Sequence, residues 1–307
     1  MIEILEVAPR DGLQNEDRTL DVDARIELIR RLVAAGSRRM EAVSFVHPLR
    51  VPQMAHAEEV MAGVEDRDDV TYIGLVLNRR GAERAVEAKV DEANIVLPLT
   101  DTFSTRNQGR PYAEMLAETR AAAALAREGG LTVSVTLAVA FGCPFEGHVP
   151  EDRLSEAIRA MADIDIDELA FADTIGVGIP RQVRRIADLV KPHLAPDRRL
   201  RFHFHNTRNT GYANALEAAG LTGLGDIVLD ASVGGFGGCP FAPRATGNIG
   251  TEDLYYALQA SGTESTSLDA PTLFEAAEWL GEQLGKPIQS LLPKAGWFPA
   301  QAPSLTS

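Results

Sequence analysis

An alternation of short apolar segments with amphipathic stretches is the feature of this chain that most limits its possible folds. Eight segments rich in β-branched and apolar residues have the character of buried strands in a parallel sheet: residues 3–8, 38–45, 70–77, 92–99, 131–140, 168–173, 200–205 and 226–233. The stretches between them have the apolar spacing of covering helices: residues 22–35, 53–66, 79–89, 111–128, 151–163, 181–194 and 209–220. Because parallel strands require crossover connections, this order predicts an α/β fold, a TIM (β/α)8 barrel, with a doubly wound open sheet as the alternative.

The length of 307 residues fits one barrel domain. Beyond the eighth apolar segment, residues 251–261 and 270–285 again have helical patterns, whereas residues 286–307 are rich in Pro, Ala and Ser. We therefore expect a catalytic barrel domain over residues 1–286, which includes a small C-terminal helical extension, and a loosely ordered tail over residues 287–307.

The composition argues against several classes of function. A net charge of −14, from 30 basic and 44 acidic residues, disfavours a protein that binds nucleic acid or an anionic membrane. The least polar long stretch, residues 131–145, is too short to span a bilayer. Two cysteines provide no disulfide framework. We expect no targeting segment, because charged, motif-like residues begin by residues 10–11. The sequence therefore predicts a cytoplasmic protein with a small-molecule ligand.

Ionisable side chains lie at or near the ends of five expected strands. The active site of a TIM barrel forms at the carboxyl ends of its strands, so these side chains are expected to meet at one rim. They are Arg10 and Asp11 after the first strand, Glu41 in the second, Asp173 at the end of the sixth, His203 and His205 in the seventh, and Cys239 in the loop after the eighth.

The His-Phe-His step in the seventh strand is the clearest sign of a metal site. Residues two apart on a strand project to the same face, so His203 and His205 point together, while Phe202 and Phe204 face the helices. Two imidazoles with a carboxylate suit a catalytic divalent ion, and Asp11 can reach the same ion once the barrel closes. The alternative is a pair of buried structural histidines.

The other candidates each have a structural alternative. Arg10 could bind a carboxylate or a developing oxyanion, or form a surface ion pair. Glu41 could orient Arg10 or reach water at a strand end, and Asp173 could cap a helix or belong to a turn. Cys239 lies in the glycine-rich segment GGFGGCP, where its thiol could transfer a proton or simply fit a tight turn. Asn248, nine residues further on, could add a neutral oxygen ligand.

Six segments carry a resemblance to a known family: EVAPRDGLQNE (6–16), EAVSFVHPLRVPQM (41–54), GCPFEG (142–147), DTIGVG (173–178), HFHNT (203–207) and GGFGGCPFAPRATGNIGTEDL (234–254). They resemble the motifs of the 3-hydroxy-3-methylglutaryl-CoA (HMG-CoA) lyases. RDGLQNE together with the GGCP loop separates these lyases from related acyl-CoA condensing barrels. The resemblance spans nearly the whole chain and implies a metal-dependent TIM-barrel lyase.

The resemblance also implies a cofactor, a substrate class and a role for each candidate residue. The cofactor would be Mg²⁺ or Mn²⁺ and the substrate an acyl-CoA ester. The implied metal ligands are Asp11, His203, His205 and Asn248. The implied catalytic residues are Arg10 for the enolate oxygen, Glu41 for the support of Arg10 and the substrate hydroxyl, Asp173 near the metal, Asp11 or His203 as the base, and Cys239 as the acid that protonates the acetyl-CoA carbanion.

Three features depart from the family pattern and bear on the acyl group and the CoA contacts. Asn206 stands where the lyases usually have Asp, Asp17 stands where they commonly have Lys, and residues 98–107 differ from the usual Ser-rich segment. HMG-CoA is the expected substrate, with citramalyl-CoA or a condensing reaction as alternatives. A catalytically silent barrel is disfavoured because the set of site residues is complete. Barrel enzymes of this kind are often dimers, so we expect a homodimer.

Overall fold

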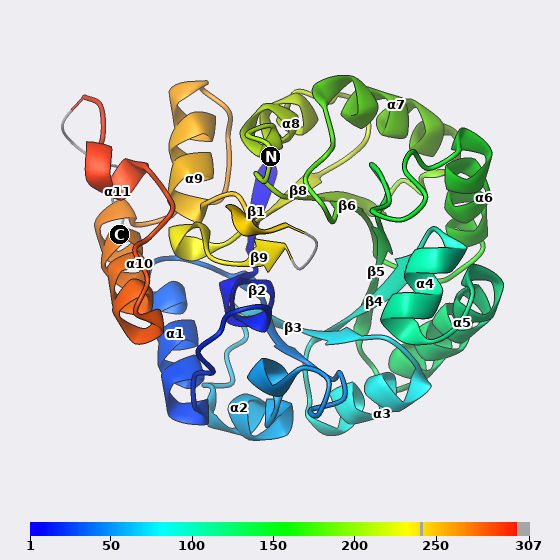
Figure 1. Ribbon diagram of the computed structural model, residues 1–307, viewed down its shortest axis with the longest axis horizontal. Coiled ribbons are helices and arrows are strands. Elements are labelled where there is room, and N and C mark those ends of the chain that lie inside the picture. The colour runs from blue at the N-terminus through cyan, green and yellow to red at the C-terminus, as the bar shows by residue number, and fades with distance from the viewer. Residues whose placement is uncertain (240–241, 300–307) are drawn as a thin grey trace.

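The computed structural model describes residues 1–239 and 242–299 (Figure 1). Eight parallel strands follow one another around a closed barrel, and the first pairs with the eighth to complete it. The strands are β1 (Ile2–Glu6), β2 (Arg39–Ser44), β3 (Thr71–Val76), β4 (Glu92–Pro98), β5 (Thr132–Ala138), β6 (Glu168–Asp173), β7 (Arg199–Phe204) and β8 (Ile227–Ala231). The predicted TIM barrel is confirmed, and the open-sheet alternative is excluded.

Helices cover the outside of the barrel at the positions that the apolar spacing predicts. They are α1 (Val22–Ala34), α2 (Ala57–Gly63), α3 (Arg79–Glu87), α5 (Tyr112–Glu128), α6 (Glu151–Ala162), α7 (Pro180–Val190) and α8 (Gly211–Ala219). The Asp21 carboxylate accepts a hydrogen bond from the Ala24 N–H at 2.8 Å and so caps the start of α1. Helix α2 begins four residues later than predicted because Pro52–Met54 forms a separate 3₁₀ turn.

The predicted C-terminal helices complete the ring of helices. Helix α9 (Thr251–Ala260) packs against α8, and α10 (Ala270–Leu284) packs against α1, so together they cover the side where β8 meets β1 (Figure 1). A short helix, α11 (Leu292–Ala295), follows. Residues 300–307 lie outside the described part of the chain, so the division at residue 286 and the loose tail stay predictions. Within the described ranges, every helix is too short or too polar to cross a bilayer.

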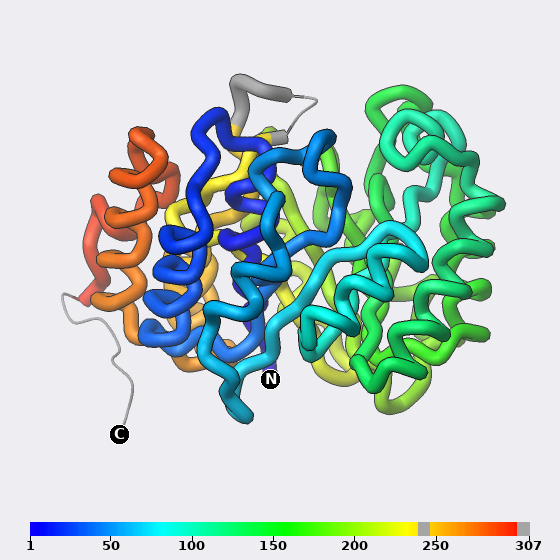
Figure 2. The backbone as a smooth tube through the Cα atoms, turned by 90° about the horizontal axis from the view of Figure 1, so that it is seen from below, coloured from blue at the N-terminus to red at the C-terminus, as the bar shows by residue number. Residues whose placement is uncertain are grey.

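Four elements at the carboxyl end of the barrel have no counterpart among the predicted ones. Residues Ala8–Gly12 form a π-helical turn directly after β1, and α4 (Asp101–Gln108) follows β4. The strands β9 (Gly238–Cys239) and β10 (Ala242–Thr246) form a small antiparallel pair after β8. Figure 2 shows the segments that follow β1, β2 and β4 at the end of the barrel opposite the N-terminus.

The inside of the barrel is unusually polar for a fold whose interior is commonly filled with branched apolar side chains. Leu5, Val7, Ile73 and Val228 make a small buried apolar cluster. Beside it lies a set of buried charged residues, which we name the interior cluster: Arg39, Glu92, Glu168 and Arg201. The Arg39 guanidinium donates to the Glu92 and Glu168 carboxylates at 2.7 Å each, so the charges balance within the barrel.

Candidate active site

The π-helical turn after β1 brings two of the predicted site residues into the barrel mouth. Its backbone closes through a hydrogen bond of 3.1 Å from the Gly12 N–H to the Val7 carbonyl. The Glu6 carboxylate accepts the Ala8 N–H at 2.8 Å and the Val233 N–H at 3.0 Å, and so joins this turn to the segment after β8. Arg10 and Asp11, one after the other in the turn, are buried as a result.

Asp11, His203 and His205 meet at one point, and we name them the rim triad. One potential ligand atom from each lies within 4.8 Å of the others. The Asp11 Oδ2 atom is 3.8 Å from His203 Nε2 and 3.6 Å from His205 Nε2. An ion with bonds of about 2.1 Å spaces its ligand atoms roughly 3.0–3.4 Å apart, so the triad is close to the size that a divalent ion requires. Strand alternation predicted that the two histidine side chains point in the same direction, and this prediction is confirmed.

A second carboxylate fixes the orientation of His203. Asp230, in β8, lies 3.0 Å from His203 Nδ1, on the opposite side of the ring from Asp11. Burial opposes protonation of His203, but the hydrogen bond to Asp230 and the charge of Asp11 outweigh it and raise the imidazole pKa. A carboxylate behind a metal-binding histidine is a common second partner. Asp230 is not among the predicted site residues, although an acidic residue inside an apolar strand is a sign that the sequence offers.

Arg10 lies between two carboxylates. It contacts Asp11 directly and donates from Nε to Glu41 Oε2 at 2.6 Å. Burial would raise the pKa of Glu41, but Arg10 and Arg201 outweigh it and lower that pKa to about 2. The Asn94 amide donates to the other Glu41 oxygen at 2.6 Å. Glu41 therefore stays ionised and orients Arg10. This agrees with the prediction that Glu41 supports Arg10.

Asn248 and Cys239 come from the segment after β8. The Asn248 amide nitrogen donates to Asp11 Oδ2 at 2.9 Å, and its backbone bridges to that of His205. Gly237 has a φ of 115°, and a side chain there would overlap the Asn248 amide, so this close approach requires glycine. Cys239 ends β9, but its side chain lies outside the described part of the structure.

Asp173 and Asn206 hold turns together beside the site. The Asp173 carboxylate accepts the N–H groups of Val177 and Gly178 at 2.8 and 2.9 Å, and burial raises its pKa. The Asn206 side chain accepts the Gly211 N–H at 3.1 Å at the start of α8. Both side chains thus accept hydrogen bonds from backbone N–H groups in this structure. For Asp173 this agrees with the alternative prediction that it belongs to a turn.

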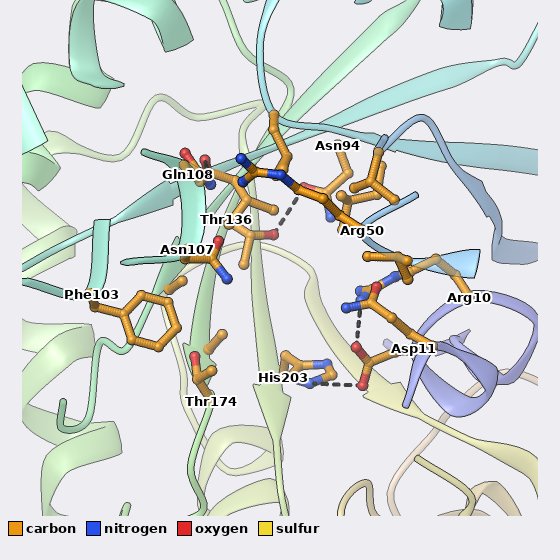
Figure 3. Close-up of a pocket in the computed structure, with 18 of the residues that line it drawn as sticks. Arg10, Asp11, Arg50, Asn94, Phe103, Asn107, Gln108, Thr136, Thr174 and His203 are labelled. Carbon is orange, nitrogen blue, oxygen red and sulfur yellow. Dashed lines mark hydrogen bonds and ion pairs between the residues drawn. The ribbon is translucent and has the colours of Figure 1, made fainter. Parts of the chain in front are cut away.

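A cavity of about 690 Å³ extends from the rim triad to the opposite side of the barrel mouth. Figure 3 shows Arg10, Asp11 and His203 pointing toward one another on one side, with Phe103, Asn107 and Thr174 across from them. Phe103 and Asn107 belong to α4, so the atypical segment 98–107 contributes to the cavity wall. Asp17 instead lies 3.7 Å from Lys286 and does not line the cavity.

Among the residues whose side chains the structure describes, five arginines line the cavity, and four of these have a described partner. Arg10 and Arg201 pair with carboxylates inside the barrel, Arg110 lies 3.3 Å from Glu118, and Arg106 lies over the Phe145 ring. For Arg50, which extends over the cavity in Figure 3, the described part of the chain supplies no counter-ion. The mouth therefore offers positive charge to an anionic ligand.

Comparison with known proteins agrees with this geometry. The profile of the HMGL-like family matches residues 1–280. The chain is 41% identical over 305 residues to an (R)-citramalyl-CoA lyase of Chloroflexus aurantiacus, which covers 96% of this chain and 95% of the relative. It is 36% identical over 289 residues to a hydroxymethylglutaryl-CoA lyase of Bacillus subtilis, covering 94% and 95%.

Two solved structures that resemble this chain are likewise HMG-CoA lyases. An HMG-CoA lyase from Acinetobacter baumannii, in complex with coenzyme A and 3-methylmalate, superposes with a TM-score of 0.90 at 38% identity, covering 99% of this chain and 97% of the other. The crystal structure of the Bacillus subtilis HMG-CoA lyase gives a TM-score of 0.89 at 34% identity, covering 95% and 97%. The chain therefore belongs to the HMGL-like family of carbon–carbon lyases.

Proposed function

We propose that the protein is a divalent-metal-dependent lyase that cleaves HMG-CoA to acetyl-CoA and acetoacetate. The observation that carries the proposal is the rim triad beside Arg10, in the wall of a cavity that crosses the barrel mouth. Asp11, His203 and His205, with Asn248, would hold Mg²⁺ or Mn²⁺, and the Asp11 carboxylate supplies the oxygen donor that such ions prefer. When bound, the ion lowers the pKa of the substrate hydroxyl and orients it with the free carboxylate.

The chain's own residues supply the remaining steps. Loss of the hydroxyl proton to Asp11 or His203 turns the alcohol into a ketone, while the neighbouring carbon–carbon bond breaks and its electron pair forms the acetyl-CoA enolate. Arg10, which Glu41 holds in place, presents positive charge to the enolate oxygen. The Cys239 thiol then gives its proton to the carbanion carbon and completes acetyl-CoA.

A second candidate substrate is (R)-citramalyl-CoA, in which the carboxylate is attached directly to the carbinol carbon. The same steps on this ester release acetyl-CoA and pyruvate. It is favoured by the 41% identity to the Chloroflexus aurantiacus citramalyl-CoA lyase and by the bound 3-methylmalate of the Acinetobacter baumannii structure. The two substrates differ by one methylene, so they require the same residues and differ in the fit of the acyl group.

The CoA portion of either substrate carries phosphate groups, and we assign Arg50 as one of their contacts. Its guanidinium lines the cavity near the opening and has no described counter-ion. Arg50→Met is expected to raise KM for the CoA ester about 10-fold and to leave KM for the matching pantetheine ester unchanged. Equal effects on both esters would show that Arg50 contacts another part of the substrate.

A direct assay tests the proposed function. The purified protein is incubated with HMG-CoA or (R)-citramalyl-CoA and Mn²⁺ or Mg²⁺, with and without EDTA, and acetoacetate and pyruvate are measured by mass spectrometry. We expect cleavage that EDTA abolishes and added metal restores. Faster release of pyruvate would assign citramalyl-CoA as the substrate. Turnover of neither ester by protein that binds Mn²⁺ would contradict both assignments.

A further inference from the structure

We propose that Arg201 is a positioning residue that holds the Arg10 side of the site and the metal side in a fixed relation. An effect of Arg201 on lyase turnover rests on the proposed function. Its effect on the orientation of His203 in the metal site is argued from the geometry alone. Arg201 lies in β7, two residues before His203, so both side chains point into the barrel. It is 1% exposed.

The guanidinium of Arg201 connects the Arg10 side of the site to the metal side. Arg201 Nη2 donates to Glu41 Oε1 at 2.8 Å, and the other oxygen of Glu41 accepts Arg10 Nε at 2.6 Å. Arg201 Nε lies 3.1 Å from Asp230 Oδ1, and the other oxygen of Asp230 lies 3.0 Å from His203 Nδ1. A continuous series of charged contacts therefore runs from Arg10 to His203 through Arg201.

The third nitrogen of Arg201 faces the floor of the barrel. Arg201 Nη1 donates to Glu168 Oε1 at 3.3 Å, and Glu168 also binds Arg39. Each guanidinium nitrogen of Arg201 thus faces a different carboxylate. Arg201 therefore acts through these three carboxylates, which is the role of a positioning residue.

The planar fork of arginine is essential to this arrangement. The three guanidinium nitrogens lie in one plane, so Arg201 can donate to Glu41 and Glu168 and form an ion pair with Asp230 at the same time. The ammonium of lysine is instead a compact charge at the end of a flexible chain. Arg201→Lys keeps the buried charge but cannot keep both the Glu41 and the Asp230 contacts. Loss of the Asp230 contact frees that carboxylate to turn and so loosens His203.

The test compares Arg201→Lys with Arg39→Lys. Arg39 is similarly buried and shares Glu168, but its described ion pairs include neither Glu41 nor Asp230. Mn²⁺ affinity of the metal-free protein is measured by electron paramagnetic resonance, alongside the thermal unfolding midpoint. We expect Mn²⁺ binding about 10-fold weaker in Arg201→Lys and unchanged in Arg39→Lys, with both midpoints lowered. Equal Mn²⁺ affinity in the two variants would overturn the proposal, because Arg201 would then only stabilise the fold.

Asp230→Asn provides a second test that does not depend on the folding of Arg201→Lys. It keeps the shape of the side chain but removes the charge that joins Arg201 to His203. We expect a similar loss of Mn²⁺ affinity, and in the double variant a loss no larger than in either single one, since both act on the same contact. Additive losses would overturn the proposal. Mn²⁺ binding requires no substrate. The Mn²⁺ measurement therefore tests the role of Arg201 even if the protein cleaves neither acyl-CoA ester.

Discussion

The interior cluster and the rim triad are both buried groups of charged or ionisable side chains, yet they differ in how their charges are matched. In the interior cluster, the nitrogens of Arg39 meet carboxylate oxygens at hydrogen-bond distance, and two arginines face two glutamates. In the rim triad, two imidazoles converge on the one carboxylate of Asp11 at 3.6 and 3.8 Å. A matched cluster stabilises the fold, whereas converging ligand atoms with space between them are suited to bind an ion.

The largest effect is expected from removing the carboxylate of the rim triad. Asp11→Ala should abolish Mn²⁺ binding and lower turnover about 10³-fold, which equals about 4 kcal/mol of activation free energy, because the ion loses its anionic ligand. Steady-state kinetics and Mn²⁺ titration measure both effects. Asp17→Ala is the matched control, since that carboxylate lies six residues away and is 96% exposed. Wild-type Mn²⁺ affinity in Asp11→Ala would remove Asp11 from the metal site.

Removing Glu168 from the interior cluster should affect stability more than chemistry, because Arg201 keeps its contacts with Glu41 and Asp230. Glu168→Ala leaves Arg39 and Arg201 buried with one carboxylate fewer, and it should lower the free energy of unfolding by about 3 kcal/mol. Urea denaturation measures the loss. Glu27→Ala removes an exposed ion pair on α1 and should cost less than about 1 kcal/mol. If the two variants were equally stable, the interior cluster would not be a stabilising element.

The loop thiol should affect turnover without affecting the metal. We expect Cys239→Ala to lower kcat about 10²-fold while Mn²⁺ affinity stays unchanged, because a proton donor is lost and no ligand is. Cys143→Ala is the control: Cys143 is buried and accepts a hydrogen bond from Thr100 at 3.1 Å, and its loss should change kcat less than about threefold. An unaltered kcat in Cys239→Ala would assign the acid role to another group.

The smallest effect concerns a buried carboxyl that neither cluster uses. Burial raises the pKa of Glu252 to about 8, and its carboxylate accepts the Gly234 N–H at 2.8 Å. Between pH 4.5 and 8 the native state keeps a proton that the unfolded chain releases, so the stability from this group is full below pH 4.5 and falls as the pH rises to 8. Glu252→Gln should flatten this slope in urea denaturation across that range, whereas the exposed Glu278→Gln should not. A wild-type slope in Glu252→Gln would show that Glu252 is ionised in the native state.

The sequence predicts the barrel because eight short segments rich in apolar and β-branched residues alternate with amphipathic stretches. It predicts the two histidines because side chains alternate strictly along a strand. It predicts α4 poorly, since only Phe103 and Ser104 of that helix are buried and the rest is polar without a helical period. Arg201 shares the alternation of His203 and His205, so the same pattern could have identified it as an inward-facing residue. Its partners could not be identified, because Glu41 and Asp230 come from strands far apart in the chain.

The closure of the barrel has a consequence for folding. The strands β1 and β8 pair across the seam between the two ends of the barrel sequence, with Ile2 opposite Ile227 and Glu6 opposite Ala231. Asp11 follows β1, whereas His203, His205 and Asn248 come from β7 and from beyond β8. An ion held by all four would therefore bridge the seam, and its full set of ligands would form only once the two ends have met. Metal binding would then favour the closed ring by mass action.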